Sequence, residues 1–207
     1  MIGHGGFAMK PIDFWFSVGS TYSYLTVMRL TAVAEAAGIP FDWRPFSVRA
    51  IMREMDNIPF ATKPIKARYM WRDIERRAAK YGIEAALPAP YPLEQFDLAN
   101  RVAVLGRREG WCRDYVVATY RRWFQLGQPA GSEPNLSDSL AEIGQNPEQV
   151  IEAANAEEIE AAYQAATEEA RSLGVFGAPT FAVDGELFWG DDRLDDAISW
   201  HRTGRVA

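Results

Sequence analysis

The residues best suited to chemistry in this chain are hydroxyls, because thiols and imidazoles are scarce. Cys112 is the only cysteine, and His4 and His201 are the only histidines. An internal disulfide is therefore impossible, and a zinc site of the usual Cys and His type is excluded. Cys112 follows Trp111 at the start of an apolar helical pattern, so we expect a buried structural thiol rather than a nucleophile. The segment Ser20–Ser23 remains as a candidate.

Ser20 lies at the junction of a predicted strand and helix. Phe14–Val18 is a short apolar run typical of a strand covered on both faces, and Gly19 ends it. Ser20 or Thr21 can then cap the helix, since a cap hydroxyl accepts a hydrogen bond from a free backbone N–H. The same helix terminus favours negative charge. A plain helix cap and an anion-stabilising serine are both compatible with this spacing.

The elements that position this junction follow from hydrophobic periodicity and turn residues. A helix over 22–37, stopped by Gly38, and a strand over 39–46 complete a βαβ unit, whose strands should be parallel. Two unrelated strands are the alternative. Asp184-Gly185 predicts a hairpin, and Asp191 or Asp192 can cap a last helix. The remaining helices and strands are predicted over 63–81, 94–108, 113–125, a segment ending at 173, 180–183, 186–189 and 193–201.

The order β-α-β, a helical block, then β-β-α predicts an α/β fold with a thioredoxin-like core and a large all-helical insertion. Residues 10–48 and 174–207 would form the thioredoxin-like domain with one mixed sheet. Residues 49–173 would form the inserted helical domain.

Ala178-Pro179 precedes the first strand of the predicted hairpin. In thioredoxin-like proteins this X-Pro bond is cis, packs beside the first strand–helix junction and leaves the preceding backbone free to pair with a ligand. An ordinary trans proline starting an edge strand is the alternative. The thioredoxin junction also carries a Cys-x-x-Cys pair, but this chain has Ser20–Ser23 there. Any sulfur chemistry must therefore come from a bound thiol, whose thiolate Ser20 would stabilise.

Three stretches carry a family resemblance. Residues 13–25, 174–181 and 188–194 resemble the 2-hydroxychromene-2-carboxylate isomerase family, which is related to kappa-class glutathione transferases. Asn57–Pro59 and 64–70 match that family's Asn-containing loop and its basic helix. Each motif is weak alone, but together they span most of the chain.

The resemblance implies that glutathione is the cofactor. Ser20 would contact the glutathione sulfur, the backbone of Ala178 would pair with the cysteinyl part, and Asp192 would bind the γ-glutamyl ammonium. Two positions depart from the family pattern: Thr21 stands where Pro is common, and Asp191 adds a negative charge where a neutral residue is frequent. The resemblance thus implies that Ser20 is the catalytic residue. The residues that it implies for glutathione binding are Asn57, Lys66, Ala178, Pro179, Asp192 and Arg193.

The implied activity is glutathione-dependent cis/trans isomerisation of an aromatic-catabolic intermediate such as 2-hydroxychromene-2-carboxylate. The thiolate would add to the substrate and leave again. A kappa-like glutathione transferase would use the same site and release a conjugate. A third possibility is a thioredoxin-like protein that binds without catalysis. The resemblance also implies a small aromatic carboxylate as substrate and a homodimer.

Charge and length set further limits. The 207 residues carry a net charge of −6, which argues against general nucleic-acid binding. No apolar run is long enough to span a bilayer, so we expect a soluble, cytoplasmic protein, with residues 1–8 as a loose leader. The segment 63–80 is basic, whereas 126–170 contains no Lys or Arg. The basic helix either covers the site and attracts anions or is a solvated face paired with acidic neighbours. Most aromatic residues should be core, although Tyr69 or Trp189 could line a flat pocket.

Overall fold

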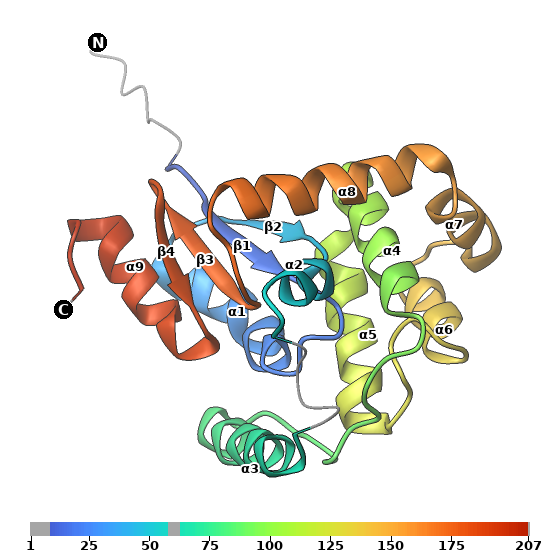
Figure 1. The fold of residues 1–207 in the computed structure, drawn as a ribbon, viewed down its shortest axis with the longest axis horizontal. Coiled ribbons are helices and arrows are strands. Elements are labelled where there is room, and N and C mark those ends of the chain that lie inside the picture. The colour runs from blue at the N-terminus through green and yellow to red at the C-terminus, as the bar shows by residue number, and fades with distance from the viewer. Residues whose placement is uncertain (1–8, 58–62, 207) are drawn as a thin grey trace.

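The computed structural model of the protein describes residues 9–57 and 63–206 (Figure 1). Four strands form a mixed sheet in the order β2-β1-β3-β4. β1 (Ile12–Phe16) and β2 (Phe41–Pro45) are parallel, which confirms the predicted βαβ unit. β3 (Thr180–Val183) runs antiparallel to β1 and forms the predicted hairpin with β4 (Glu186–Trp189).

β1 lies at the centre of the core. The side chains of Phe14, Trp15 and Phe16 are fully buried, as expected for a strand covered on both faces. The Phe14 ring stacks on that of Phe181 in β3, with 5.6 Å between centroids. β1 ends two residues earlier than predicted, because the backbone of Val18 pairs with a helical side chain instead of a neighbouring strand.

Helices follow β2 and return the chain to β3. α4 and α8 pack against β2, whereas α9 packs against β3 and β4. In Figure 1, α2 lies close to the end of β1, and α3 lies beneath the main body. The helices are α1 (Ser23–Ala37), α2 (Val48–Glu54), α3 (Pro64–Tyr81), α4 (Phe96–Glu109), α5 (Cys112–Leu126), α6 (Asn135–Glu142), α7 (Pro147–Ala154), α8 (Glu157–Ser172) and α9 (Leu194–Thr203), the last preceded by a 3₁₀ turn at Asp191–Arg193.

This arrangement confirms the predicted α/β thioredoxin-like fold with a helical insertion. The exact division at residues 48 and 174 stays a prediction. Cys112 is buried, and burial raises the pKa of its thiol, in keeping with a structural role. Within the described ranges, no helix is both long and apolar enough to cross a membrane. The predicted leader, residues 1–8, lies outside the described residues.

Candidate active site

The loop between β1 and α1 is held by two buried side chains of the helical block. The amide of Asn100 in α4 accepts a hydrogen bond from the Val18 N–H and donates one to the Val18 carbonyl, each at 2.8 Å. The Tyr120 hydroxyl of α5 contacts the carbonyls of Ser17 at 2.9 Å and Ser20 at 3.0 Å. Both side chains are buried, so breaking one of these hydrogen bonds would leave polar groups unpaired away from water, which is costly. The loop that carries Ser20 therefore has a defined conformation.

Gly19 gives this loop its path. Its φ of +119° is a conformation that side chains disfavour, and a Cβ would lie 2.5 Å from Cδ2 of Phe96. α1 then begins at Ser23 with Tyr22 at the N-cap position and no side-chain capping bond. The prediction that Ser20 or Thr21 occupies that position was wrong. Ser20 Oγ still accepts a long hydrogen bond of 3.4 Å from the Ser23 N–H.

Ser20 faces the start of β3. Its hydroxyl donates a 2.7 Å hydrogen bond to the Ala178 carbonyl, and the Ala178–Pro179 peptide bond is cis. We expected both backbone groups of Ala178 to be free for a ligand, but its carbonyl is occupied by Ser20. Its N–H makes no hydrogen bond to any described residue.

An apolar chamber of about 540 Å³ opens in front of Ser20. Four of the residues predicted to form the site line it: Ser20, Asn57, Lys66 and Ala178. Its apolar wall comes from α2, α3, the connection between α3 and α4, the segment before β3 and the end of β4. The main contributors to that wall are Val48, Met52, Met55, Met70, Tyr91, Phe176 and Trp189. The chamber suits a flat, mostly apolar molecule.

A smaller polar pocket of about 280 Å³ adjoins the chamber and contains Pro179 and Asp192. The Asp192 carboxylate lies 3.6 Å from the Arg77 guanidinium. Arg77 also binds Asp73, and Tyr22 donates to Asp73 at 3.1 Å. Burial, together with the Asp73 carboxylate, raises the pKa of Tyr22, so this phenol stays a neutral donor. Asp192 is also 3.6 Å from the guanidinium of Arg193, so the carboxylates of this pocket are paired with arginines, and Asp192 stays 43% exposed.

Asp191 and Arg193 lie differently from our expectation. Asp191 is buried and paired with Arg29 at 3.0 Å, and it accepts a hydrogen bond from Thr26 at 2.9 Å. Its extra negative charge is therefore compensated inside the protein. Neither Asp191 nor Asp192 caps α9, because a 3₁₀ turn intervenes. Arg193 is exposed, binds Asp196 at 2.8 Å and lines neither hollow.

Four residues line both the chamber and the polar pocket: Tyr22, Tyr69, Ala178 and Trp189. The sequence had indicated no definite role for the three aromatic residues among them. Trp189 remains 55% exposed although it is a large aromatic residue. Its indole lies on Gly177, where a Cβ would approach Nε1 to 2.3 Å. Gly177, directly before Ala178, is the residue of the sequence that could have indicated this close approach.

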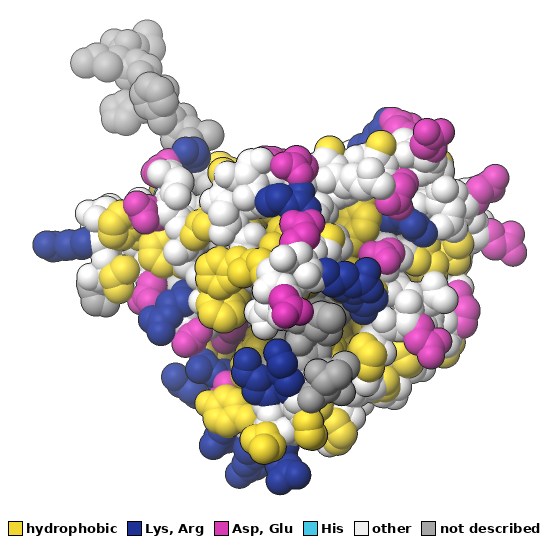
Figure 2. Space-filling view, viewed as in Figure 1, with side chains coloured by type: hydrophobic (Ala, Val, Ile, Leu, Met, Phe, Trp, Pro, Cys, Tyr) yellow, Lys and Arg dark blue, Asp and Glu magenta, His cyan; other side chains and the backbone are white. Residues whose placement is uncertain are grey.

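The basic helix α3 serves both of the roles considered. On the face seen in Figure 2, Lys and Arg side chains gather over α3. Lys63 and Lys66 near its start line the chamber, and neither forms an ion pair with a described residue. Towards its end, Arg72 pairs with Glu75 and Arg77 pairs with Asp73. Two lysines without an ion pair among the described residues therefore give the chamber a positive potential.

Comparisons with known proteins agree with this arrangement. The chain is 29% identical over 188 residues to a 2-hydroxychromene-2-carboxylate isomerase of Sphingobium xenophagum, covering 90% of this chain and 95% of that protein. It is 25% identical to glutathione S-transferase kappa 2 of Caenorhabditis elegans, covering 89% and 88%. A solved 2-hydroxychromene-2-carboxylate isomerase superposes with a TM-score of 0.81 at 23% identity, covering 92% and 93%.

The sheet order β2-β1-β3-β4, with β1 and β2 parallel, β3 antiparallel to β1 and β4 antiparallel to β3, is that of the thioredoxin class. Residues 11–198 match the model of the DSBA-like thioredoxin domain, and the chain belongs to that family. It does so without a thiol pair at the junction, where Ser20–Ser23 stand. The resemblance to 2-hydroxychromene-2-carboxylate isomerases expected from the sequence is confirmed.

Proposed function

We propose that this protein is a glutathione-dependent isomerase that acts on a small aromatic carboxylate such as 2-hydroxychromene-2-carboxylate. The observation that carries the proposal is the position of the Ser20 hydroxyl, bound to Ala178 at the edge of an apolar chamber that contains no cysteine. Similarity to isomerases and to a kappa-class transferase supports the same chemistry. The homodimer and the cytoplasmic location expected from the sequence stay predictions.

The residues around Ser20 fit glutathione. The carboxylate of Asp192, 43% exposed in the polar pocket, suits an ammonium group. The N–H of Ala178, which has no partner among the described residues, suits a peptide carbonyl. Lys66 and Asn57 line the chamber and suit carboxylates. When bound, glutathione supplies the thiol that this chain lacks, a nucleophile able to add reversibly to a conjugated acid.

The chain's own contribution is electrostatic. Ser20 can turn its hydroxyl from the Ala178 carbonyl towards a neighbouring anion, which a hydroxyl can do by rotation of its proton. The first N–H groups of α1 add positive potential at the same place. Together they favour a thiolate over a thiol and stabilise negative charge during the reaction. The apolar wall excludes water, and Lys63 and Lys66 attract an acidic substrate.

Two measurements test the proposal. Calorimetric titration should show saturable glutathione binding, and Asp192→Asn should weaken it, whereas Asp195→Asn on the exposed side of α9 should not. Turnover of 2-hydroxychromene-2-carboxylate should require glutathione without consuming it. Stoichiometric consumption would instead identify a kappa-like transferase. Failure to bind glutathione at millimolar concentration would favour a thioredoxin-like protein that binds without catalysis.

A further inference from the structure

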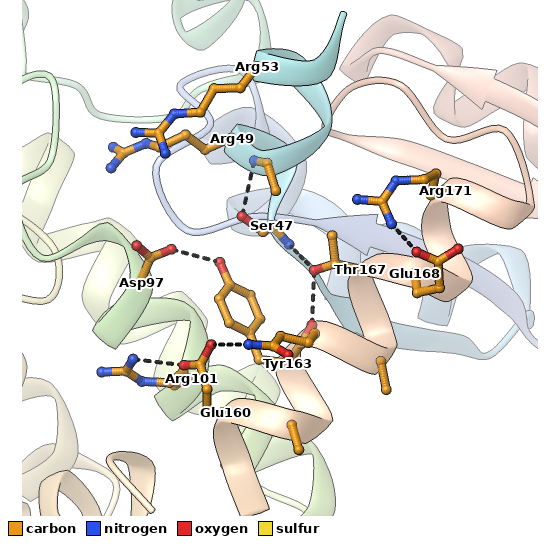
Figure 3. A pocket seen from close by; sticks show the side chains of 14 residues that line it. Ser47, Arg49, Arg53, Asp97, Arg101, Glu160, Tyr163, Thr167, Glu168 and Arg171 are labelled. Atoms are coloured by element: carbon orange, nitrogen blue, oxygen red, sulfur yellow. Dashed lines mark hydrogen bonds and ion pairs between the residues drawn. The ribbon is translucent and has the colours of Figure 1, made fainter. Parts of the chain in front are cut away.

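A second hollow lies on the opposite side of α2 from Ser20. It has a volume of about 680 Å³ and runs between α2, α4 and α8 (Figure 3). α2 separates the two hollows: Val48 and Met52 line the apolar chamber, whereas Arg49 and Arg53 line the second hollow. We call the second hollow the arginine cleft. Nothing in the proposed isomerase chemistry uses it.

The walls of the arginine cleft are held together by polar contacts. The Ser47 N–H donates to Thr167 Oγ1 at 3.0 Å, which joins the start of α2 to α8. Arg171 of α8 binds Glu54 at the end of α2 at 2.7 Å. On the far wall, Arg101 binds Glu160 at 2.9 Å. The cleft is therefore formed before any ligand arrives, which lowers the entropic cost of binding.

Arg49 and Arg53 stand one helical turn apart and extend in the same direction from α2, over Asp97 (Figure 3). Neither forms an ion pair within the described part of the chain. Arg49 is nevertheless fixed: it donates to the Leu93 carbonyl at 3.1 Å, and its guanidinium lies 3.9 Å from the centroid of the Phe96 ring. A half-buried, immobilised guanidinium without a carboxylate partner among the described residues is well suited to pairing with an anion.

The rest of the lining agrees with a polar ligand. The buried Nε of Arg101 has no hydrogen-bond partner among the described residues. The Tyr163 hydroxyl donates a long hydrogen bond of 3.3 Å to Asp97, and the Gln164 side chain is exposed at the same wall. We infer that the arginine cleft binds a small polar molecule through an oxyanion, phosphate or carboxylate, held between the guanidinium groups of Arg49 and Arg53.

Inorganic phosphate and succinate are suitable probes of this site. At low ionic strength, calorimetric titration of the full chain should show saturable binding of at least one of them with one site per chain. Tighter binding of phosphate would identify a phosphoryl ligand, and tighter binding of succinate would identify a carboxylate ligand. Absence of saturable binding by both probes would overturn the inference.

Variants separate a built site from general charge attraction. Arg53→Ala should weaken binding by about tenfold or more, because a charge-assisted bond is lost, and this exposed side chain has no structural partner. Arg113→Ala is the matched control, since Arg113 is an exposed arginine outside the cleft. Asp97→Asn should strengthen binding by a few fold, as it removes a negative charge beneath the arginines. Equal losses in Arg53→Ala and Arg113→Ala would contradict the assignment.

Discussion

Different kinds of contact predominate around the two hollows on either side of α2. Behind the apolar chamber, buried neutral side chains hold the backbone: Asn100 and Tyr120 bind the loop that carries Ser20. Around the arginine cleft, exposed ion pairs such as Arg171 with Glu54 join the walls in addition to the buried bond between Ser47 and Thr167. Buried hydrogen bonds are short-ranged and directional, whereas exposed ion pairs are weak and screened by salt. Buried, directional bonds suit the apolar chamber, where the Ser20 hydroxyl must be placed precisely. Exposed charges suit the arginine cleft, where a charged group is proposed to bind.

The largest expected effect concerns the hydroxyl of Ser20. Ser20→Ala should lower kcat about 100-fold to 1,000-fold, the usual cost of losing one donor to a reacting anion. The melting temperature should stay nearly unchanged, because only the bond to the Ala178 carbonyl and the long bond from the Ser23 N–H are removed. Ser172→Ala, at the end of α8 beside the arginine cleft, is the control and should keep full activity. Wild-type turnover by Ser20→Ala would exclude the proposed role of the serine.

The second prediction compares the stability contributed by a buried hydrogen bond behind the apolar chamber with that contributed by an exposed one near the arginine cleft. Asn100→Ala should lower the free energy of unfolding by about 3 kcal/mol, because it leaves the buried Val18 backbone unpaired. Asn155→Ala, which removes an exposed bond to Arg101 at the cleft, should cost less than about 1 kcal/mol. Urea denaturation of both variants gives the two values. Equal losses would mean that the two regions do not differ as described.

The third prediction concerns the contact between Gly177 and Trp189 in the candidate active site. Gly177→Ala should displace the Trp189 indole and lower kcat/KM about tenfold, since a Cβ does not fit beneath Nε1. Trp189→Ala should lower kcat/KM through the same contact. The double variant should therefore lose no more than Trp189→Ala alone. Additive losses would show that Gly177 acts on something other than Trp189.

The smallest expected effect is the change of stability with pH that Glu160 contributes at the arginine cleft. A hydrogen bond from Arg101 holds the pKa of Glu160 below its ordinary value of 4.5. A lowered pKa in the folded protein stabilises it above pH 4.5, and this contribution is lost as the pH falls through the folded value. Glu160→Gln should therefore show a slightly smaller loss of stability between pH 6 and pH 3 than the wild type, measured by urea midpoint. An identical pH profile would indicate that the Arg101 pair contributes nothing measurable.

Local chemistry was enough to predict several elements from the sequence. Gly38 ends α1 in the left-handed conformation, and Asp184-Gly185 forms the turn between β3 and β4. These features depend on neighbouring residues only, so they can be inferred without knowing the fold. The proximity of Ser20 and Ala178 was expected from the resemblance, and the structure places the two in contact.

Features that join distant segments were not predictable in this way. Arg29 neutralises Asp191 across 162 residues, and Asn100 holds Val18 across 82. No local pattern marks such partners. Neither did the sequence reveal that α2 would divide an apolar chamber from a cleft with two arginines that have no carboxylate partner among the described residues.

The sequence by itself determined that this protein has a hydroxyl and no thiol where a strand meets a helix. Only the tertiary structure decided what that hydroxyl does. Local rules favoured a helix cap, and the Ser20 Oγ does accept a long hydrogen bond of 3.4 Å from the Ser23 N–H. Its shorter bond, of 2.7 Å, is the one that it donates to the Ala178 carbonyl. That carbonyl is 158 residues away in the chain, and folding alone brings it to Ser20.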